Sequence, residues 1–464
     1  MTLIKSISGI RGTMGGSEGE GLTPIDVVKF TSSFCAIMQN KNKTKNIKVV
    51  VGRDARISGE MVNGLVCNTL IGMGAHVIDL GLSTTPTVEV AVPGEGAHAG
   101  IILTASHNPK QWNALKLLNE KGEFISAEEG KEVLRLAESN EIKFAQIDEL
   151  GSIERKEYLT KHLEEILGLE LVNKKIIEAA NLKLAVDAVN STGGIFVPAL
   201  LNALGVTKVE KLYCEPNGHF PHNPEPLPEH LKDISELVVR EQCDFGIVVD
   251  PDVDRLAFVC EDGSMFGEEY TLVAVADFIL SKKPGNTVSN LSSTRALRDV
   301  TLKYGGSYQA SAVGEVNVVA LMKETNAVIG GEGNGGIIYP ETHYGRDALA
   351  GLALFLTHFA EKKMKMSELR DSYPAYVISK NKIELSADLD VDHVLNEVKG
   401  MFPEATINTI DGVKFDFPDG WVHLRKSNTE PIVRVIAEHK TKAEAESLAQ
   451  KVINAVNKLA GITV

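Results

Sequence analysis

The chain has 464 residues, of which 43% are hydrophobic and 24% charged, and its formal net charge is −14. This length predicts two to four domains, and the negative charge disfavours nonspecific binding to nucleic acid. The five cysteines form no CxxC pair and lie mostly in apolar runs, which predicts reduced thiols and a cytoplasmic location. We find no signal-peptide pattern and no apolar run of about 18 residues, so we expect neither secretion nor a membrane partner.

Residues 1–151 alternate predicted helices with predicted strands. Thr23, Pro24 and Asp26 are typical of a helix start, with Thr23 as the N-cap. An apolar stripe follows on that helix, at Val27, Phe30, Phe34 and Ile37. Three strands are predicted to end in polar turns, within 47–56, 76–92 and 100–109. This pattern indicates an α/β domain, in which ligands bind beyond the carboxyl ends of the strands.

Three further domains are predicted after this one. The charged stretch 154–167 is expected to be a helical connector at the start of an α/β domain over 152–256, and another α/β domain covers 257–372. From 373 to 464 the pattern changes to antiparallel strands with a hairpin at 418–420. The last helix is expected to have a capping box, Thr441 with Glu444, and a stripe at Leu448, Val452, Ala455 and Leu459. The predicted fold is therefore three consecutive α/β mixed-sheet domains, resembling a structural repeat, followed by a smaller α+β domain.

The sequence DPDVDR follows the apolar run FGIVV and places carboxylates on alternate residues, Asp250, Asp252 and Asp254. Alternate carboxylates in an extended loop direct their oxygens toward one point, as in sites for hard cations. A calcium EF-hand is excluded because the glycine at loop position 6 and the flanking helices are missing. A solvated acidic turn is the alternative, but three acids after a buried strand would repel one another without a cation. We therefore predict a Mg²⁺ site.

A second polar loop, TASHNP at 104–109, follows an apolar strand. Ser106 has no local His-Asp relay, and we expect His107 to point away from it. A hydroxyl group beside a metal ion can still carry a phosphoryl group, because the ion stabilises its alkoxide or bridges its phosphate. A plain turn closed by Asn108 and Pro109 is the alternative. The predicted metal loop favours phosphoryl transfer through Ser106.

Two more loops have the side chains to bind a phosphorylated sugar. Residues 425–435 offer guanidinium, hydroxyl and amide donors that suit a phosphate, unless they form an ordinary hairpin loop flanked by arginines. Its candidate ligands are Arg425, Ser427, Asn428, Thr429 and Arg434. The glycine-rich loop 330–336 lacks the Lys-Ser/Thr of a Walker loop, and its Glu332 and Asn334 suit sugar hydroxyls.

Taken in order, these motifs resemble those of the α-D-phosphohexomutases, the family of phosphoglucomutase, phosphomannomutase and phosphoglucosamine mutase. The resemblance covers all 464 residues through SGIRGT (8–13), GRDARISG (52–59), TASHNP (104–109), DPDVDR (250–255), GEGNGG (331–336) and RKSNTEP (425–431). It implies four domains around a central cleft, a phosphoserine at Ser106, and Mg²⁺ held by that phosphate with Asp250, Asp252 and Asp254. It also implies catalytic assistance from Arg11, Lys116 and Arg255, sugar binding by Glu332, and phosphate binding by the loop 425–434.

The reaction that the resemblance implies moves a phosphoryl group from the serine to a sugar hydroxyl. The resulting hexose bisphosphate then returns its other phosphate to the serine. We accordingly expect a small-molecule sugar phosphate as substrate, Mg²⁺ as cofactor, hexose 1,6-bisphosphate as activator, and a monomer or homodimer. The motif 425–434 would hold whichever phosphate is not reacting.

Two motifs depart from the form common in bacterial members. Where that form reads Glu-x-Ser-x-His, this chain has glycine at the histidine position, Gly336, and VGEVNV at 313–318 lacks a lysine seen in many members. With HYGRDAL, these changes resemble the archaeal-type phosphoglucosamine mutase branch. We expect Gly336 to leave open space and His343 to transfer the proton instead. Because Asn334 adds an amide beside Glu332, we expect a preference for glucosamine 6-phosphate and glucosamine 1-phosphate.

Other functions remain open on the sequence. A phosphoglucomutase/phosphomannomutase is the main alternative. A metal-dependent phosphatase with Ser106 as nucleophile would have no need for a second phosphate site. A non-catalytic sugar-phosphate sensor is disfavoured because Ser106, Lys116 and all three aspartates are retained.

Overall fold

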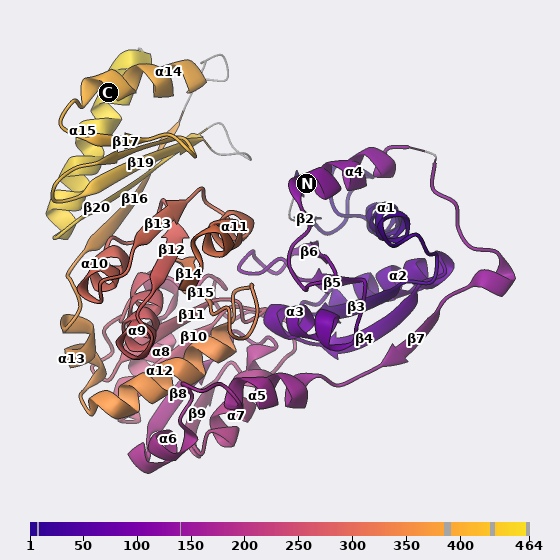
Figure 1. Cartoon of the computed structure of the whole chain (residues 1–464), viewed down its shortest axis with the longest axis horizontal. Helices are drawn as coiled ribbons and strands as arrows, with labels where there is room; N and C mark the ends of the chain where they lie inside the picture. The colour runs from indigo at the N-terminus through magenta and orange to yellow at the C-terminus, as the bar shows by residue number, and fades with distance from the viewer. Residues whose placement is uncertain (7–8, 140, 385–390, 427–431, 461–464) are drawn as a thin grey trace. The chain divides into compact units, whose positions relative to one another are not determined.

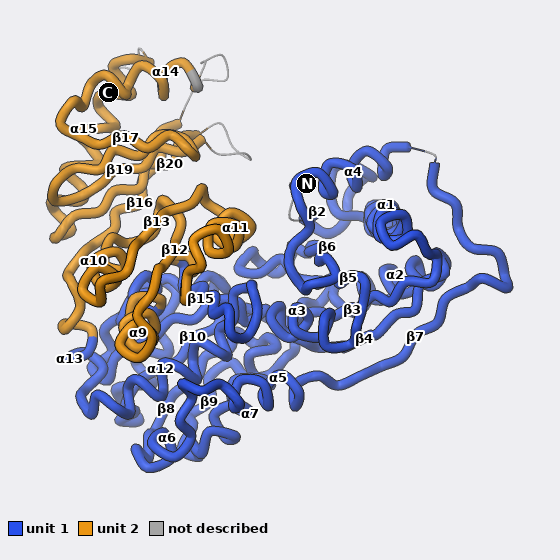
Figure 2. The backbone as a smooth tube through the Cα atoms, in the orientation of Figure 1, with its two compact units in different colours: residues 1–271, 334–369 blue, residues 272–333, 370–464 orange. Residues whose placement is uncertain are grey.

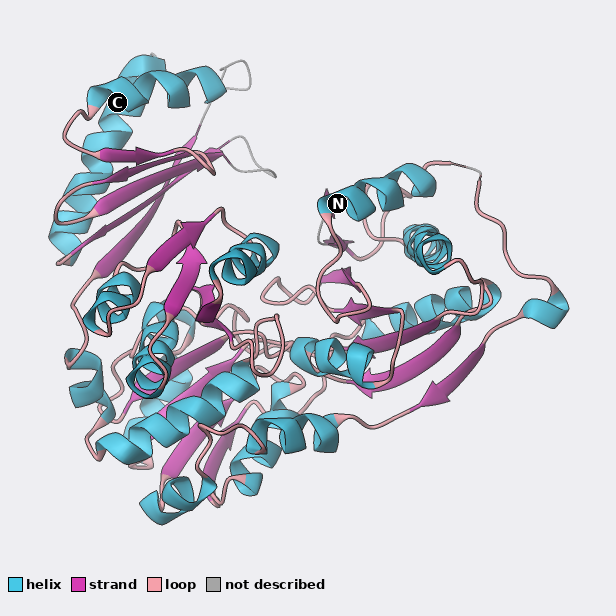
Figure 3. Ribbon diagram, in the orientation of Figure 1, coloured by secondary structure: helices cyan, strands magenta, loops and turns pink. Residues whose placement is uncertain are grey.

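The computed structural model describes residues 1–464 except 7–8, 140, 385–390, 427–431 and 461–464 (Figure 1). The chain divides into two compact units, residues 1–271 with 334–369 and residues 272–333 with 370–464 (Figure 2). Helices and β-sheets occur in both units (Figure 3). Among the described residues, none of the helices combines the length and apolar character that crossing a bilayer requires.

The largest sheet belongs to the first unit and has the strand order β1-β2-β6-β5-β3-β4-β7. Strands β5, β3, β4 and β7 are mutually parallel, whereas β6, β2 and β1 pair antiparallel. The strands are β1 Leu3–Ser6, β2 Gly9–Thr13, β3 Lys48–Arg53, β4 His76–Leu82, β5 Ala99–Leu103, β6 Trp112–Leu118 and β7 Ser152–Arg155. The associated helices are α1 Pro24–Asn42, α2 Gly59–Gly72, α3 Thr85–Gly94, α4 Ala127–Ala137 and the short 3₁₀ helix η1 Ile147–Glu149.

Helix α1 begins where the sequence predicts. Thr23 is its N-cap and forms a capping box with Asp26, which satisfies backbone N–H groups that have no partner within the helix. The predicted stripe Val27, Phe30, Phe34 and Ile37 is buried in the core.

The expected helical connector at 154–167 is partly wrong. Glu154 and Arg155 belong to β7, which pairs in parallel with β4, and only Leu159–Leu167 forms a helix, α5. Strand β7 lies at the edge of the sheet. Charged side chains are common on edge strands, so a charge-rich sequence did not distinguish this strand from a solvated helix.

The second sheet, also in the first unit, has the order β11-β10-β8-β9, with β11 antiparallel to β10. Its strands are β8 Lys183–Asp187, β9 Lys208–Leu212, β10 Phe245–Val249 and β11 Leu256–Cys260, and the first unit also contains β15 Gly336–Ile338. Its helices are α5 Leu159–Leu167, α6 Lys174–Ala180, α7 Gly193–Ala203, η2 Pro228–His230, α8 Lys232–Arg240 and α12 Ala348–Lys362. Helix α12 packs through Phe355, whose ring stacks on Phe258 of β11 with centroids 4.1 Å apart.

The second unit combines a parallel sheet with an antiparallel one. Strand β12 pairs in parallel with β13 and with β14, and the other sheet has the order β16-β20-β19-β18-β17. The strands are β12 Asn286–Asn290, β13 Tyr308–Ser311, β14 Ala327–Glu332, β16 Val377–Glu384, β17 Thr406–Asn408, β18 Val413–Asp416, β19 Trp421–Lys426 and β20 Ile432–His439. The helices are α10 Ala296–Lys303, α11 Glu315–Thr325, α14 Val391–Glu397, η3 Val398–Met401 and α15 Lys442–Ala460, with α9 Glu268–Lys282 and α13 Met366–Asp371 at the unit boundaries.

The C-terminal predictions are largely confirmed. In the hairpin between β18 and β19 the backbone N–H of Phe417 donates to the carbonyl of Gly420 at 2.8 Å. The N–H of Glu444 donates to the hydroxyl of Thr441 at 3.3 Å at the start of α15. The apolar stripe predicted for α15 is wrong at its last residue, because Leu459 is 40% exposed and Val456 is buried instead. The predicted fold class, three α/β domains and then an α+β domain, is confirmed.

Candidate active site

The loop between β10 and β11 brings the three predicted carboxylates together. Asp250, Asp252 and Asp254 are each 0% exposed, and one oxygen of each lies within 4.8 Å of the others. The carboxylate of Asp250 closes the loop by accepting from the backbone N–H groups of Asp254 and Arg255, both at 3.1 Å. Val253 has φ of 62°, a left-handed conformation that costs a branched residue about 1–2 kcal/mol. This backbone strain is typical of a functional loop.

The donor set fits a divalent cation. The Oδ1 atoms of Asp252 and Asp254 are buried and have no hydrogen-bond partner among the described residues. Burial raises the pKa of Asp250 well above its usual value, and the charges of Asp254 and Asp252 raise it further. Buried carboxylate oxygens without donors are costly, whereas a hard cation such as Mg²⁺ prefers oxygen ligands. These three residues could therefore hold the metal ion.

Ser106 lies beside this loop. Its Oγ donates to Oδ2 of Asp250 at 2.7 Å, and the residue is 8% exposed. Its φ of 47° places it in the left-handed region. The expectation that His107 points away from Ser106 is wrong, because Nδ1 of His107 lies 3.4 Å from the serine Oγ. Burial, followed by the charge of Arg255, lowers the pKa of His107 well below its usual value, so this imidazole is neutral near pH 7.

Cationic side chains surround the carboxylates. Lys116 on β6 donates to Asp252 at 2.6 Å and to Asp254 at 3.1 Å. Burial favours protonation of Asp254, but Arg346, Lys116 and Arg255 outweigh it and lower its pKa. Burial likewise opposes the charge of Lys116, but Asp252 and Asp254 outweigh it and raise its pKa. Lys116 is therefore a charged ammonium within contact of two metal-loop carboxylates.

Arg255 and Arg11 have looser contacts with this region. The Nη1 of Arg255 lies 3.5 Å from Glu225, and its buried Nε has no hydrogen-bond partner in the described part of the chain. Arg11 on β2 donates to the side chain of Asn108 in the serine loop at 3.5 Å. The structure thus brings Arg11 to the Ser106 loop and Arg255 to the end of the metal loop.

Arg56 is a site residue that the sequence reasoning missed. It is 1% exposed, and its guanidinium donates to four carbonyl oxygens of the serine loop and its end, those of Ser106, Asn108, Pro109 and Trp112. Asp54 accepts from its Nε at 2.9 Å and from Thr104 at 2.7 Å. The signal was present in GRDARISG, whose second arginine is available to organise a neighbouring loop. Arg56 therefore fixes the conformation that presents Ser106.

Thr85 and Arg346 were also missed. Thr85, in the first turn of α3, donates through its hydroxyl to Asp252 at 2.5 Å and through its N–H to the Asp252 carbonyl at 2.9 Å. Arg346 donates to Oδ2 of Asp254 at 2.7 Å and is 8% exposed. STTPT and HYGRDAL contain these residues, but neither segment by itself indicates a partner in the metal loop.

The expectation that Gly336 leaves open space is wrong. A Cβ atom at this position would lie 2.4 Å from Cδ of Arg346 and 3.1 Å from both Cγ of Arg346 and Oδ1 of Asn334. The Arg346 side chain therefore occupies the space, and glycine is needed to let it pass to Asp254. Asn334 accepts from the N–H of Gly336 at 3.2 Å.

Within the described part of the chain, His343 makes no hydrogen bond to the metal-loop residues. Its Nε2 lies 3.4 Å from Oδ2 of Asp347 and its Nδ1 lies 3.4 Å from Oε2 of Glu89. The proton-transfer role expected of His343 stays a prediction.

The remaining candidate residues lie in the second unit. Glu332 ends β14, is 5% exposed, and accepts from Asn290 at 2.8 Å and from the N–H of Gly314 at 3.2 Å. Ser293 accepts from the N–H of Gly333 at 2.9 Å. These contacts hold the carboxylate of Glu332 in one orientation at the strand end. Asn334 belongs to the first unit.

Arg425 and Arg434 form a basic pair on the C-terminal sheet. Arg425 on β19 is directly opposite Arg434 on β20, which is in turn opposite Lys382 on β16. Directly paired residues of an antiparallel sheet share a face, and like charges there are destabilising without a counter-charge. Asp411 lies 2.9 Å from Arg425 and compensates part of this charge. The predicted ligands Ser427, Asn428 and Thr429 lie outside the described residues.

Known protein families match this chain along nearly all of its length. Four domain families match in order: phosphoglucomutase/phosphomannomutase alpha/beta/alpha domain I over residues 3–143, domain II over 156–263, domain III over 267–376, and the C-terminal domain over 375–455.

Individual relatives cover nearly the full length. The chain is 35% identical to a phosphoglucomutase/phosphomannomutase of Thermococcus kodakarensis, covering 94% of this chain and 95% of the relative. It is 32% identical to a probable phosphoglucosamine mutase of Methanopyrus kandleri, with 97% of each covered. A crystal structure of a phosphoglucomutase/phosphomannomutase family protein from Burkholderia thailandensis superposes with a TM-score of 0.84 at 26% identity, covering 99% of this chain and 98% of that one. The chain therefore belongs to the phosphoglucomutase/phosphomannomutase family, and it is a phosphohexomutase, an isomerase.

Proposed function

We propose that this phosphohexomutase interconverts hexose 6-phosphates and 1-phosphates through a phosphoserine at Ser106, with glucosamine phosphates as its preferred pair. The observation that carries the proposal is the contact of the Ser106 hydroxyl with Asp250, 2.7 Å, at a buried loop of three carboxylates. A nucleophilic hydroxyl beside a hard-cation site is the arrangement that phosphoryl transfer requires.

Asp250, Asp252 and Asp254 would hold Mg²⁺ together with the Ser106 phosphate. When bound, the ion supplies positive charge that offsets the charge developing on the transferring phosphoryl group. Lys116 and Arg255 add further positive charge, and Arg346 keeps Asp254 ionised.

The proposed transfer balances in two half-reactions. The bond from phosphorus to Ser106 Oγ breaks as a bond to a sugar hydroxyl oxygen forms, and that hydroxyl loses its proton to a base. In the second half-reaction the bond from the other phosphorus of the resulting hexose bisphosphate to its sugar oxygen breaks as a bond to Ser106 Oγ forms. The serine hydroxyl gives up its proton and the freed sugar oxygen takes one up, which releases the isomeric monophosphate. A hexose 1,6-bisphosphate is the proposed activator because it phosphorylates a serine that has lost its phosphate. Arg11 and Lys116 are the proposed groups for the acid–base steps, and His343 is the candidate that the sequence adds to them.

A second phosphate must stay bound while the first reacts. Arg425 and Arg434 are proposed to bind it, because their directly opposed charges on neighbouring strands, with Lys382 beside them, favour a bound anion. Ser427, Asn428 and Thr429 are the further ligands proposed for it from the sequence. This requirement distinguishes a mutase from a phosphatase.

The amino-sugar preference rests on Glu332 and Asn334. A carboxylate can accept from an ammonium group at C2 of glucosamine, and an amide can both donate and accept. The Methanopyrus relative, named a probable phosphoglucosamine mutase, supports this choice. The Thermococcus relative, named a phosphoglucomutase/phosphomannomutase, supports the alternative pair of glucose and mannose phosphates.

A substrate panel tests the proposal. The ratio kcat/KM would be measured for the 1-phosphates of glucosamine, glucose and mannose at one fixed bisphosphate concentration. We expect glucosamine 1-phosphate to react fastest. A glucose or mannose 1-phosphate preference of tenfold, about 1.4 kcal/mol of transition-state discrimination, contradicts the amino-sugar assignment. Release of inorganic phosphate at the rate of substrate loss would instead indicate a phosphatase, and no turnover of any sugar would indicate a sensor.

A further inference from the structure

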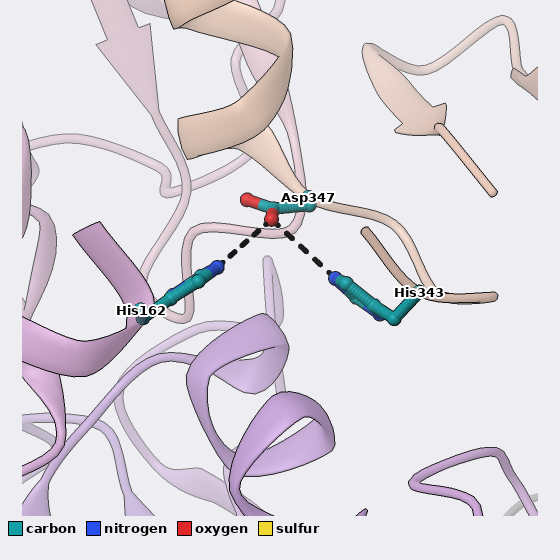
Figure 4. A group of neighbouring side chains, drawn as sticks. All are labelled: His162, His343 and Asp347. Carbon is teal, nitrogen blue, oxygen red and sulfur yellow. Dashed lines mark hydrogen bonds and ion pairs between the residues drawn. The ribbon is translucent and has the colours of Figure 1, made fainter. Parts of the chain in front are cut away.

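A second group of potential metal ligands lies in the first unit, apart from the aspartate loop. His162 of α5, His343 and Asp347 have donor atoms within 4.8 Å of one another. The His162 and Asp347 side chains are each 1% exposed and that of His343 is 8% exposed. Figure 4 shows both imidazoles directed at the same carboxylate oxygen of Asp347 from different sides.

The two distances from Asp347 suit a shared ion. Oδ2 of Asp347 lies 3.0 Å from Nε2 of His162 and 3.4 Å from Nε2 of His343. Metal–ligand bonds of 2.0–2.2 Å in a tetrahedral zinc site place neighbouring ligand atoms about 3.3 Å apart. The other oxygen of Asp347 is engaged elsewhere, since Oδ1 accepts from the N–H groups of Leu349 and Ala350 at the start of α12. Helix capping thus orients Oδ2 toward the imidazoles.

The outer nitrogen of His162 also has the partner expected of a metal ligand. Nδ1 of His162 lies 2.9 Å from the hydroxyl of Thr87, which is itself 2.6 Å from the hydroxyl of Thr84. A histidine that binds a metal almost always directs its other ring nitrogen to an oxygen of this kind, which fixes its tautomer. His162 does so. Nδ1 of His343 lies 3.4 Å from Oε2 of Glu89, at ion-pair distance but without a hydrogen bond in the described part of the chain.

We propose that His162, His343 and Asp347 bind a divalent transition-metal ion of the zinc class, which has a structural role. Imidazole nitrogens favour Zn²⁺ and similar ions over Mg²⁺, which prefers oxygen ligands throughout. The burial of the ligands leaves the ion away from substrate, which favours a structural role over a catalytic one. The alternative is a hydrogen-bonded network without an ion, in which Asp347 accepts from both imidazoles.

The ion would join segments that are far apart in the sequence and that frame the aspartate loop. His162 and Asp347 are 185 residues apart. Arg346, directly before Asp347, contacts Asp254, and Thr85, two residues before Thr87 on α3, contacts Asp252. A metal ion at this point would therefore help to keep Arg346 in contact with Asp254 and Thr85 in contact with Asp252.

Metal binding to the full-length protein tests the site. Protein treated with EDTA and then kept in excess Mg²⁺, to saturate the oxygen-ligand loop, would be dialysed against Zn²⁺ and analysed by mass spectrometry for metal content. We expect one Zn²⁺ per wild-type chain, and a Co²⁺ derivative with the strong visible absorption of four-coordinate nitrogen and oxygen ligation. Zn²⁺ should also raise the Tm of the Mg²⁺-saturated protein.

Matched variants identify the ligands. His162→Gln and His343→Gln should each lose the bound Zn²⁺, Thr87→Val should weaken it 10- to 100-fold, and the exposed His219→Gln should bind as wild type does. Ser106→Ala should lose mutase activity and keep its Zn²⁺, so the site and the proposed function can fail independently.

Two results would contradict the proposal of a metal site. One is a wild-type chain that takes up no Zn²⁺ above background in excess Mg²⁺, an outcome that does not depend on any variant folding. The other is an unchanged Zn²⁺ affinity in folded His343→Gln. The same variant distinguishes a metal ligand from a proton-transfer group. If His343 is a ligand, His343→Gln should lose the bound Zn²⁺ and have a lower Tm. If His343 transfers a proton, the variant should have a lower kcat and keep its Zn²⁺.

Discussion

Gly336→Ala should destabilise the first unit through Arg346. The added methyl group would lie 2.4 Å from Cδ of Arg346 and 3.1 Å from its Cγ, so the arginine side chain must shift. Overpacking of a filled site typically costs about 1–3 kcal/mol. Loss of the buried contact between Arg346 and Asp254 would add to this cost, although Lys116 remains 3.1 Å from the same carboxylate. We therefore expect Gly336→Ala to lower the free energy of unfolding of the first unit by about 2–4 kcal/mol.

A double-mutant cycle isolates the cause. In an Arg346→Ala background the clashing Cγ and Cδ atoms are absent, and of the three nearest neighbours of the added methyl group Oδ1 of Asn334 remains, at 3.1 Å. The added cost of Gly336→Ala should then fall below about 1 kcal/mol, which gives a coupling energy of at least 1 kcal/mol between two contacting residues. The free energy of opening would be measured by hydrogen exchange of peptides from residues 334–369. Equal costs in both backgrounds would refute the idea that Gly336 serves to accommodate Arg346.

The remaining predictions concern the serine, the metal loop and a buried lysine. Ser106→Ala should reduce mutase turnover by several orders of magnitude with the fold retained, and intact mass should show one phosphate on wild type and none on the variant; full activity would exclude the phosphoserine role. Asp252→Asn should shift the Mg²⁺ dependence of activity to higher concentration, and superimposable titrations would indicate a merely structural loop. Burial lowers the pKa of Lys414 to about 8, so the unfolded chain binds more protons between that pH and about 10.4. The free energy of unfolding of wild type relative to Lys414→Met should therefore rise with pH across this window, by up to about 3 kcal/mol, and a flat or falling difference in urea titrations would contradict the buried-lysine assignment.

The sequence by itself determined the parts of this protein that depend on local pattern. The alternation of Asp250, Asp252 and Asp254 after a buried strand was enough to predict a three-carboxylate loop, because side-chain spacing and strand burial are local properties. The Thr23 cap of α1 and the order of α/β and α+β segments are confirmed for the same reason. The connector at 154–167 failed where an edge strand and a solvated helix have similar compositions.

Tertiary structure decided which distant residues meet. Arg346 and Asp254 are 92 residues apart, and nothing in the sequence around Gly336 indicates that an arginine side chain fills the space that the glycine leaves. Arg56 organises a serine loop 50 residues away through carbonyl groups, which every residue has and which therefore leave no pattern in the sequence. The group formed by His162, His343 and Asp347 likewise depends on helix packing between remote segments. Local spacing predicts which side chains share one loop or one face, whereas the contacts between loops depend on how the elements pack.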